Sequence, residues 1–362
     1  MRLHLLGLPH TRTVDAFSHC AYTAKVRKFI PMMAAQGYTI THYGVGEPDV
    51  AGAEHLEVLT PSQQEALMGF HPLDKVRSPE FVGQSTNVAS AHYRAFNEAL
   101  GPLLRSRVQP DDIICLPFGH GHQQGTHGLE HLTVETGIGY PTCVSGYRIY
   151  ESYAWMHWHL GRENRPAWIS EWVVPNYFDP ADWPLRPTPP TEGTYVLYFV
   201  RITQEKGMNV IPHLAKHRPD LTFLLCGQGD PAPWLTQPNI VYEPPKVGRE
   251  RAAMFHGAKC VLLPTVYTEP FGGVAIEAMM TGTPVITSDH GAFTETVPCR
   301  RCRPHTEAEW LAALGVALTK DPAALRSHAL SRYSTAVIGP QYHEIFQQIP
   351  QMRRTGWHGS QE

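Results

Sequence analysis

Residues 260–287 read CVLLPTVYTEPFGGVAIEAMMTGTPVIT. The uncharged runs at 260–264 and 284–287 predict two strands that are buried on both faces. Between them, residues 274–280 have the composition of a helix that ends near Gly282. A strand, a helix and a second strand in this order predict a parallel sheet covered by helices, the α/β class.

The glycine pair in this stretch lies where the predicted helix begins. The first amides of a helix have no intrahelical partner and face the positive end of its dipole, so Gly272 and Gly273 would let a phosphate approach the backbone closely. Glu277, one turn further on, is expected to accept the hydroxyls of a neutral diol such as a ribose. Glu269 is expected to face the group beyond the phosphates. The alternative is that both glutamates are solvated side chains around an ordinary helix cap.

The rest of the chain repeats the alternation of strand and helix. Helical periodicity is clearest at 22–36, and a proline cluster at 175–194 predicts a connection between two halves. We therefore expect an N-terminal domain at 1–175, a C-terminal domain at 176–340, and a helix and tail at 341–362 that returns to the N-terminal domain. Strands are predicted at 3–8, 39–43, 113–118, 172–174, 195–200, 222–226, 239–242, 260–264 and 284–287.

Composition excludes several classes of protein. The formal charge of the 362 residues is -3, and 42% of them are hydrophobic, which does not favour nonspecific binding to nucleic acid. No signal peptide is evident, and no run reaches the ~18 apolar residues of a membrane span, so we expect a cytoplasmic protein without a transmembrane segment. The seven cysteines are scattered, which favours reduced thiols. Cys299 and Cys302 form one isolated CxxC pair, too little to predict a metal or redox site.

The stretch that contains Glu269 and Glu277 resembles the E-x7-E signature of the GT4-type retaining glycosyltransferases, which have the GT-B fold. That fold consists of two facing Rossmann-like domains with parallel sheets and a cleft between them. Other motifs follow in the family's order over roughly residues 174–297, and the similarity is weak before them. They are Val174-Pro-Asn176, Phe199-Val-Arg201 with Gln204-Glu-Lys206-Gly207, Gly227-Gln-Gly229 and Gly291-Ala-Phe-Thr-Glu295.

The resemblance implies roles for these residues. Arg201 and Lys206 would bind the donor diphosphate, Glu277 would hold the ribose, and Glu269 would face the donor sugar. Two cations beside a leaving diphosphate would stabilise the charge that grows there, so no metal is expected. The alternative for Arg201 and Lys206 is a surface pair on a turn. The remaining predicted substrate-binding residues of this domain are Gly227, Phe271, Gly272, Gly273 and Val274.

The chain departs from the family pattern at three places. Val200 stands where the family usually has glycine, and Ala292 replaces the second glycine of the last motif. Both predict a differently shaped backbone around the diphosphate. In addition, the glycine loop expected after the first strand is replaced by a longer polar loop at 7–19.

Histidines cluster after the predicted strand at 113–118. The family often has a histidine here that lies close to the donor sugar, and His120 or His122 could take that place, with His120 favoured because it is nearer the strand. A histidine-rich surface loop is the alternative. The flanking glycines and the lack of a nearby cysteine or acid at ligand spacing argue against zinc.

The resemblance thus predicts a retaining, metal-independent transferase. It would move a sugar from a UDP- or GDP-linked donor, without any other cofactor, to a hydroxyl on a glycan, small molecule, lipid-linked or nucleic-acid acceptor. A catalytically silent protein that binds sugar nucleotides or glycans is the first alternative. A transferase acting on modified DNA is the second, for which a basic groove could come from Arg12, Lys25, Arg27 and Lys28. A phosphorylase is disfavoured because no pyridoxal phosphate lysine motif is evident.

Overall fold

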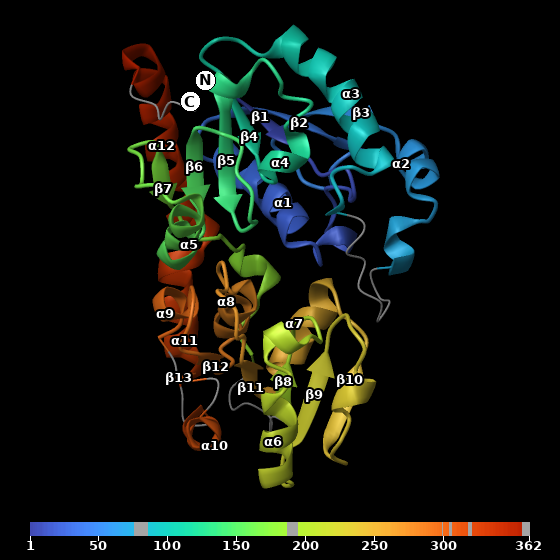
Figure 1. Cartoon of the computed structure of the whole chain (residues 1–362), viewed down its shortest axis with the longest axis vertical. Helices are drawn as coiled ribbons and strands as arrows, with labels where there is room; N and C mark the ends of the chain where they lie inside the picture. The colour runs from blue at the N-terminus through green and yellow to red at the C-terminus, as the bar shows by residue number, and fades with distance from the viewer. Residues whose placement is uncertain (76–85, 187–194, 299, 304–305, 318–320, 357–362) are drawn as a thin grey trace.

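The computed structural model describes residues 1–75, 86–186, 195–298, 300–303, 306–317 and 321–356, which form two α/β domains stacked along the long axis (Figure 1). Cys299 of the predicted CxxC pair and residues 187–194 of the predicted connection lie outside this part of the chain. No helix within it is long and apolar enough to cross a membrane.

The N-terminal domain is built on a seven-stranded parallel sheet in the order β3-β2-β1-β4-β5-β6-β7. Leu3 of β1 pairs with Ile40 of β2 on one side and with Ile113 of β4 on the other. The order reverses between β1 and β4, which is where ligands bind in such sheets. The strands are β1 (Arg2–Leu6), β2 (Thr39–Val45), β3 (Glu54–Leu59), β4 (Ile113–Leu116), β5 (Thr133–Ile138), β6 (Tyr147–Tyr150) and β7 (Glu171–Val173).

The C-terminal domain repeats this topology in a six-stranded parallel sheet, in the order β10-β9-β8-β11-β12-β13. Here the order reverses between β8 and β11, where Val261 pairs with Leu197. The predicted α/β class, with two Rossmann-like sheets, is therefore confirmed. The strands are β8 (Tyr195–Tyr198), β9 (Thr222–Cys226), β10 (Ile240–Glu243), β11 (Ala258–Leu263), β12 (Val285–Ser288) and β13 (Arg300–Cys302).

Helices cover both sheets (Figure 1). Those of the N-terminal domain are α1 (Ala21–Ala34), α2 (Pro61–Met68), α3 (Ala91–Arg107), α4 (Gly119–His122) and α5 (Tyr153–Glu163). They are followed by α6 (Val210–His217), α7 (Gly248–His256), α8 (Gly273–Met280), α9 (Phe293–Thr296), α10 (Glu307–Ala317), α11 (Pro322–Tyr333) and α12 (Thr335–Thr355).

Helix α12 leaves the C-terminal domain and packs on the N-terminal one (Figure 1). Phe346 of α12 is fully buried, and the ring of Tyr342 meets that of Phe29 on α1 edge to face at 5.3 Å between centroids. The same hydrophobic cluster contains Leu3 and Ile113 of the central strands. The N-terminal core is therefore completed by residues that follow the whole C-terminal domain in sequence.

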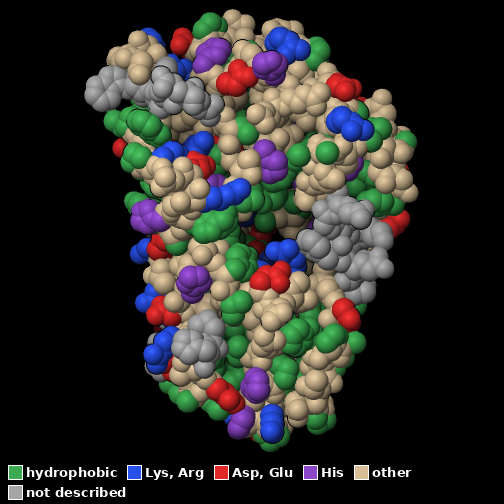
Figure 2. Space-filling view, in the orientation of Figure 1, with side chains coloured by type: hydrophobic (Ala, Val, Ile, Leu, Met, Phe, Trp, Pro, Cys, Tyr) green, Lys and Arg blue, Asp and Glu red, His purple; other side chains and the backbone are tan. Residues whose placement is uncertain are grey.

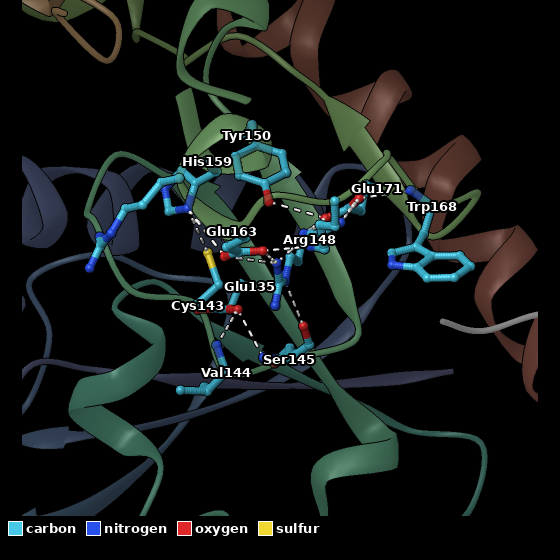
Figure 3. Close-up of polar contacts among 12 residues, drawn as sticks. Glu135, Cys143, Val144, Ser145, Arg148, Tyr150, His159, Glu163, Trp168 and Glu171 are labelled. Atoms are coloured by element: carbon cyan, nitrogen blue, oxygen red, sulfur yellow. Dashed lines mark hydrogen bonds and ion pairs between the residues drawn. The ribbon is translucent and has the colours of Figure 1, made fainter. Parts of the chain in front are cut away.

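All of the predicted strands are present, and β3, β5, β6 and β13 occur in addition. Two of these strands, β5 and β6, carry charged side chains that are largely withdrawn from water, which hides the strands from a search for apolar runs. Glu135 of β5 is fully buried, and Arg148 of β6 binds Glu163 at 2.9 Å (Figure 3). A polar network therefore satisfies charges that the sequence pattern alone disfavours in a strand.

The carboxylate of Glu135 is held by neutral donors. Its Oε2 accepts hydrogen bonds from the amides of Val144 and Ser145, each at 2.9 Å (Figure 3). Its Oε1 accepts one from the Tyr140 hydroxyl at 3.0 Å. Burial raises the pKa of Glu135 to about 7, although these hydrogen bonds oppose the shift. The network ties the loop after β5 to the sheet.

Replacing Glu135 with glutamine should change how stability depends on pH. The raised pKa means that the folded state holds the proton longer than the unfolded chain, so the wild type loses unfolding free energy as pH rises from about 4.5 through about 7. Between pH 5 and 8 the loss from this one group should be about 2 to 3 kcal/mol. Urea unfolding at both pH values measures the difference in unfolding free energy between Glu135→Gln and wild type. This difference should shift in favour of the variant by about 2 to 3 kcal/mol from pH 5 to pH 8. Glu98→Gln, at an exposed position on α3, is the control, and parallel pH profiles for wild type and Glu135→Gln would contradict the assignment.

Candidate active site

A cavity of about 390 Å³ lies between the two domains, and Figure 2 shows the surface hollowed there, with basic and acidic side chains at its edge. Residues of α1 and of the loops after β1, β5 and β6 form one wall. The opposite wall includes every predicted site residue of the C-terminal domain: Arg201, Lys206, Gly227, Glu269, Phe271, Gly272, Gly273, Val274 and Glu277.

These residues come together because they follow the carboxyl ends of neighbouring strands. Arg201 follows β8, Gly227 follows β9, and Glu269 follows β11. The order β9-β8-β11 makes these three strand ends adjacent and places the site at the point where the strand order reverses.

Two glycines allow the turns at these strand ends to pack closely. Gly207 has a φ of 80°, and a Cβ there would collide with the carbonyl oxygen of Pro264 after β11. A Cβ on Gly227 would collide with the carbonyl oxygen of Val200. Both clashes are with backbone atoms, which cannot move aside as a flexible side chain can. The glycines are therefore required for the turn that carries Arg201 and Lys206.

Val200 and Ala292, which stand where the family usually has glycine, have backbone conformations that any residue can adopt. Among the described residues, the positive φ values outside glycine are confined to Asn164, so Val200 needs no glycine-like conformation. Ala292 has a φ of -61°, and its amide donates to the carbonyl of Glu269 at 3.0 Å. Ala292 thus braces the loop that carries Glu269.

The helix start has the geometry expected for an anion site. Gly272 caps α8 with a φ of 80°, and the amide of Ala275 makes the first helical bond, to the Gly272 carbonyl at 2.9 Å. The amides of Gly273 and Val274 precede that bond and lie in the cavity wall. The backbone amides at the start of α8 and the positive end of the helix dipole both favour a negatively charged group at this point.

Lys206 is a buried cation in the C-terminal wall of the site. Its Nζ lies 2.6 Å from Glu269 Oε2 and donates to the Tyr267 hydroxyl at 2.8 Å. Burial lowers the pKa of Lys206, but Glu269 and Tyr267 raise it by more, so the net pKa is above the ordinary value. The ammonium therefore stays charged. Arg201 is exposed and adds its guanidinium to the same wall.

Glu277 has a cation of its own. It lies one turn into α8, is 9% exposed, and its Oε2 contacts Nη2 of Arg251 on α7. Arg251 also lines the cavity. The ion pair compensates a carboxylate that is largely withdrawn from water.

The N-terminal wall contributes Lys28, Lys25 and Glu151. Lys25 Nζ lies 2.5 Å from Glu151 Oε1 and donates to the Gly137 carbonyl at 2.6 Å, and both side chains are buried. Lys28 Nζ donates to the Tyr177 carbonyl at 2.8 Å, and burial lowers its pKa to about 8. This wall is therefore polar with largely compensated charge.

The basic residues considered for a DNA-binding groove are mostly paired with acidic side chains. Arg12 pairs with Glu65 and Arg27 with Asp49, in addition to the pair of Lys25 with Glu151. Three of the four cations that would attract a polyanion thus have a carboxylate partner, which disfavours that alternative.

His120 and His122 lie on α4 and are not part of the cavity wall. His122 is fully buried, and burial lowers its pKa to about 3, so it is a neutral core side chain. The ring of His120 packs against that of Phe118 at 4.4 Å between centroids. No group of three or more His, Cys, Asp or Glu side chains that could hold a metal ion occurs in the described part of the chain.

The two domains also meet directly beside the cavity. The Ser152 hydroxyl donates to the carbonyl of Pro270, next to Glu269, at 2.7 Å. The first amides of α5, of Tyr153 and Ala154, donate to the carboxylate of Glu295 on α9 at 2.9 and 2.6 Å. Glu295, which was noted only as part of a motif, therefore caps a helix of the other domain.

Among the side chains of the wall, sequence reasoning did not assign Tyr267 or Arg251, and it considered Lys28 only for a groove that would bind DNA. A signal existed for Tyr267, because it stands two residues before Glu269 in the same loop after β11. Arg251 had no such signal, since it lines the cavity only because of how helix α7 packs.

Comparison with known proteins agrees with this geometry. The family described as "Glycosyl transferases group 1" matches residues 194–320. Glycogen synthase of Mycobacterium tuberculosis is 33% identical over 174 residues, 43% of this chain and 42% of that protein. The phosphatidyl-myo-inositol mannosyltransferase of Mycolicibacterium smegmatis is 28% identical over 198 residues, 49% of this chain and 51% of that protein. The chain thus spans about half or less of the length of these curated relatives.

Solved structures extend the likeness to both domains. AviGT4, a glycosyltransferase involved in avilamycin A biosynthesis, covers 97% of this chain and is itself covered over 98%, with a TM-score of 0.66 and 16% identity. HepE of Anabaena, solved in complex with UDP and glucose, covers 96% of this chain and is covered over 99%, with a TM-score of 0.58 and 15% identity. At such identities the likeness concerns the fold. Residues 194–320 thus match the group 1 glycosyl transferases, and the two domains together have the GT-B fold of the solved glycosyltransferases.

Proposed function

We propose that this protein transfers a sugar from a nucleoside diphosphate donor to a hydroxyl acceptor, with retention of the anomeric configuration and without a metal ion. The observation that carries the proposal is the convergence, in one cavity, of the start of α8, the Lys206 ammonium and the Glu277 carboxylate. Each matches one part of a nucleoside diphosphate sugar. The relatives named for glycogen and inositol mannoside synthesis support hydroxyl groups as acceptors.

In the proposed complex the diphosphate lies at the amides of Gly273 and Val274, beside Lys206 and Arg201. Glu277 accepts the ribose hydroxyls, and Glu269 faces the donor sugar. The bond between the anomeric carbon and the β-phosphate oxygen breaks while the acceptor oxygen bonds to the same face of that carbon. The acceptor proton passes to the departing phosphate. The cations stabilise the charge that develops on the diphosphate, the part that a metal ion plays in other transferases.

A nucleotide screen followed by a turnover assay tests the proposal. UDP, GDP and ADP should be offered first, because a ligand that binds only the folded state raises its melting temperature. The matching nucleotide sugar is then incubated with hydroxyl acceptors in the presence of EDTA, and the anomer of the product is assigned by proton NMR. We expect donor consumption that survives EDTA and a product with the configuration of the donor. Loss of activity with EDTA or an inverted product would remove that part of the proposal, and an intact donor after hours would favour the silent binding protein.

Replacing Glu277 with alanine should weaken the binding of the nucleoside diphosphate by about 10- to 100-fold. A hydrogen bond to a charged group contributes about 1.5 to 3 kcal/mol, which corresponds to this range. Calorimetric titration of wild type and variant with the tightest nucleoside diphosphate measures the change. Glu344→Ala, at an exposed position on α12, serves as the control. Equal affinities for wild type and Glu277→Ala would remove Glu277 from the nucleotide site.

A further inference from the structure

The partner of Glu277 is itself held on several sides. The guanidinium carbon of Arg251 lies 5.1 Å from the ring centroid of Phe199 and 5.7 Å from that of Trp183. Both rings belong to the hydrophobic core of the C-terminal domain. The side chain of Arg251 is 17% exposed, so the guanidinium is a plane fixed between the core and the cavity.

Arg251 meets the carboxylate through one oxygen. The contact joins Nη2 to Oε2 of Glu277, and no other hydrogen bond to Glu277 side-chain oxygens is found among the described residues. The second oxygen, Oε1, keeps its lone pairs for a ligand hydroxyl, and Oε2 can accept another. The ion pair thus fixes the orientation of the carboxylate and leaves its oxygens able to accept hydrogen bonds from a ligand.

A compensating cation is required at this place. Glu277 is one turn from the amides that would hold a diphosphate, and a bare carboxylate there would repel the ligand and be costly to bury. Lys28 also lies in the wall, but its ammonium is bound to the Tyr177 carbonyl rather than to Glu277. Arginine suits the task because it cannot lose its proton and because its planar head stacks on rings.

We propose that Arg251 is the positioning residue of ribose recognition: it holds the Glu277 carboxylate in one orientation, so that the site distinguishes a ribonucleotide from a 2′-deoxyribonucleotide. This inference rests on the proposed function, since it assigns a partner to the ribose contact of that site. Arg251 itself acts through Glu277 and has no direct part in the transfer step.

The test compares each ribonucleoside diphosphate with its 2′-deoxy counterpart. Calorimetric affinities for UDP and dUDP, or for GDP and dGDP if guanine binds tighter, give one ratio for each protein. The wild type should bind the ribonucleotide about 10-fold or more tighter than the 2′-deoxyribonucleotide, because the ribonucleotide makes one additional hydrogen bond to a charged group. Arg251→Met and Glu277→Gln should each reduce the ratio below about 3-fold, and the double variant should fall no further than either alone. Arg249→Met, exposed on the same helix, should keep the wild-type ratio.

The outcomes separate this inference from the proposed function. If Arg251→Met weakens both nucleotides equally and keeps the ratio, the inference is overturned and the proposed function stands. If Glu277→Gln keeps the ratio, Glu277 does not read the ribose and the inference falls as well. A wild type that binds no nucleoside diphosphate would overturn both. Circular dichroism and a melting curve confirm that the variants fold, and Arg251→Gln replaces Arg251→Met for the same comparison if the latter does not.

Discussion

Replacing Lys206 with alanine is expected to lower kcat by about 10²- to 10³-fold, the usual effect of removing one group that stabilises charge in a transition state. The ammonium is buried and is held by Glu269 and Tyr267, so it is fixed before the donor arrives. Because the charge on the leaving diphosphate grows as the bond to the sugar breaks, the loss should appear in kcat more than in KM. Initial rates at saturating donor and acceptor measure it.

Lys216→Ala is the matched control, because Lys216 is an exposed lysine on α6 of the same domain. It should retain wild-type rates. Removing Lys206 also leaves Glu269 without its cation, so the melting temperature of the variant should be recorded beside the rates. A folded Lys206→Ala protein with an unchanged kcat would remove Lys206 from the transition state and, with it, the reason for placing the diphosphate there.

Replacing Gly207 with alanine is expected to destabilise the C-terminal domain by about 2 to 5 kcal/mol. A non-glycine residue in the left-handed region costs about 1 to 2 kcal/mol, and forcing a methyl group into a packed site adds about 1 to 3 kcal/mol. At Gly207 both apply, since its φ is 80° and the added Cβ meets the Pro264 carbonyl. Urea unfolding measures the change, and activity should fall at the same time because the turn carries Lys206.

Gly69→Ala separates the two contributions. Gly69 ends α2 with a φ of 76°, and nothing lies within 4 Å of an added Cβ. This variant should show the conformational cost alone, about 1 to 2 kcal/mol. Similar losses for Gly207→Ala and Gly69→Ala would show that the turns after β8 and β11 do not pack as closely as described.

The C-terminal half was predictable because its signals are local. The apolar runs of β8, β9 and β11 mark buried parallel strands, and the motif residues follow directly at their ends. A parallel sheet then fixes which ends are neighbours, so spacing along the chain becomes proximity in space. The glycines carry their own signal, since Gly207 and Gly227 stand where the backbone of two turns must touch.

What the sequence could not supply depends on partners that are far apart in the chain. Strands β5 and β6 carry Glu135 and Arg148, whose burial is tolerable only because of groups from other elements. Arg251 reaches Glu277 through the packing of two helices. His120 and His122 are two residues apart in the same glycine-containing stretch, and only the fold shows that His122 lies in the core. In each case the pattern gives the residue and tertiary packing gives its environment.

The return of α12 to the first domain has a consequence for biosynthesis. A ribosome completes the strands of the N-terminal sheet long before it reaches Phe346 and the other apolar side chains of that helix. During this interval the nascent N-terminal domain exposes the surface on α1 that α12 later covers, while the C-terminal sheet is already available to fold. Native assembly of the first half of the chain therefore has to wait for translation of α12, and ribosome-bound chains arrested before residue 335 should remain sensitive to protease in the N-terminal domain.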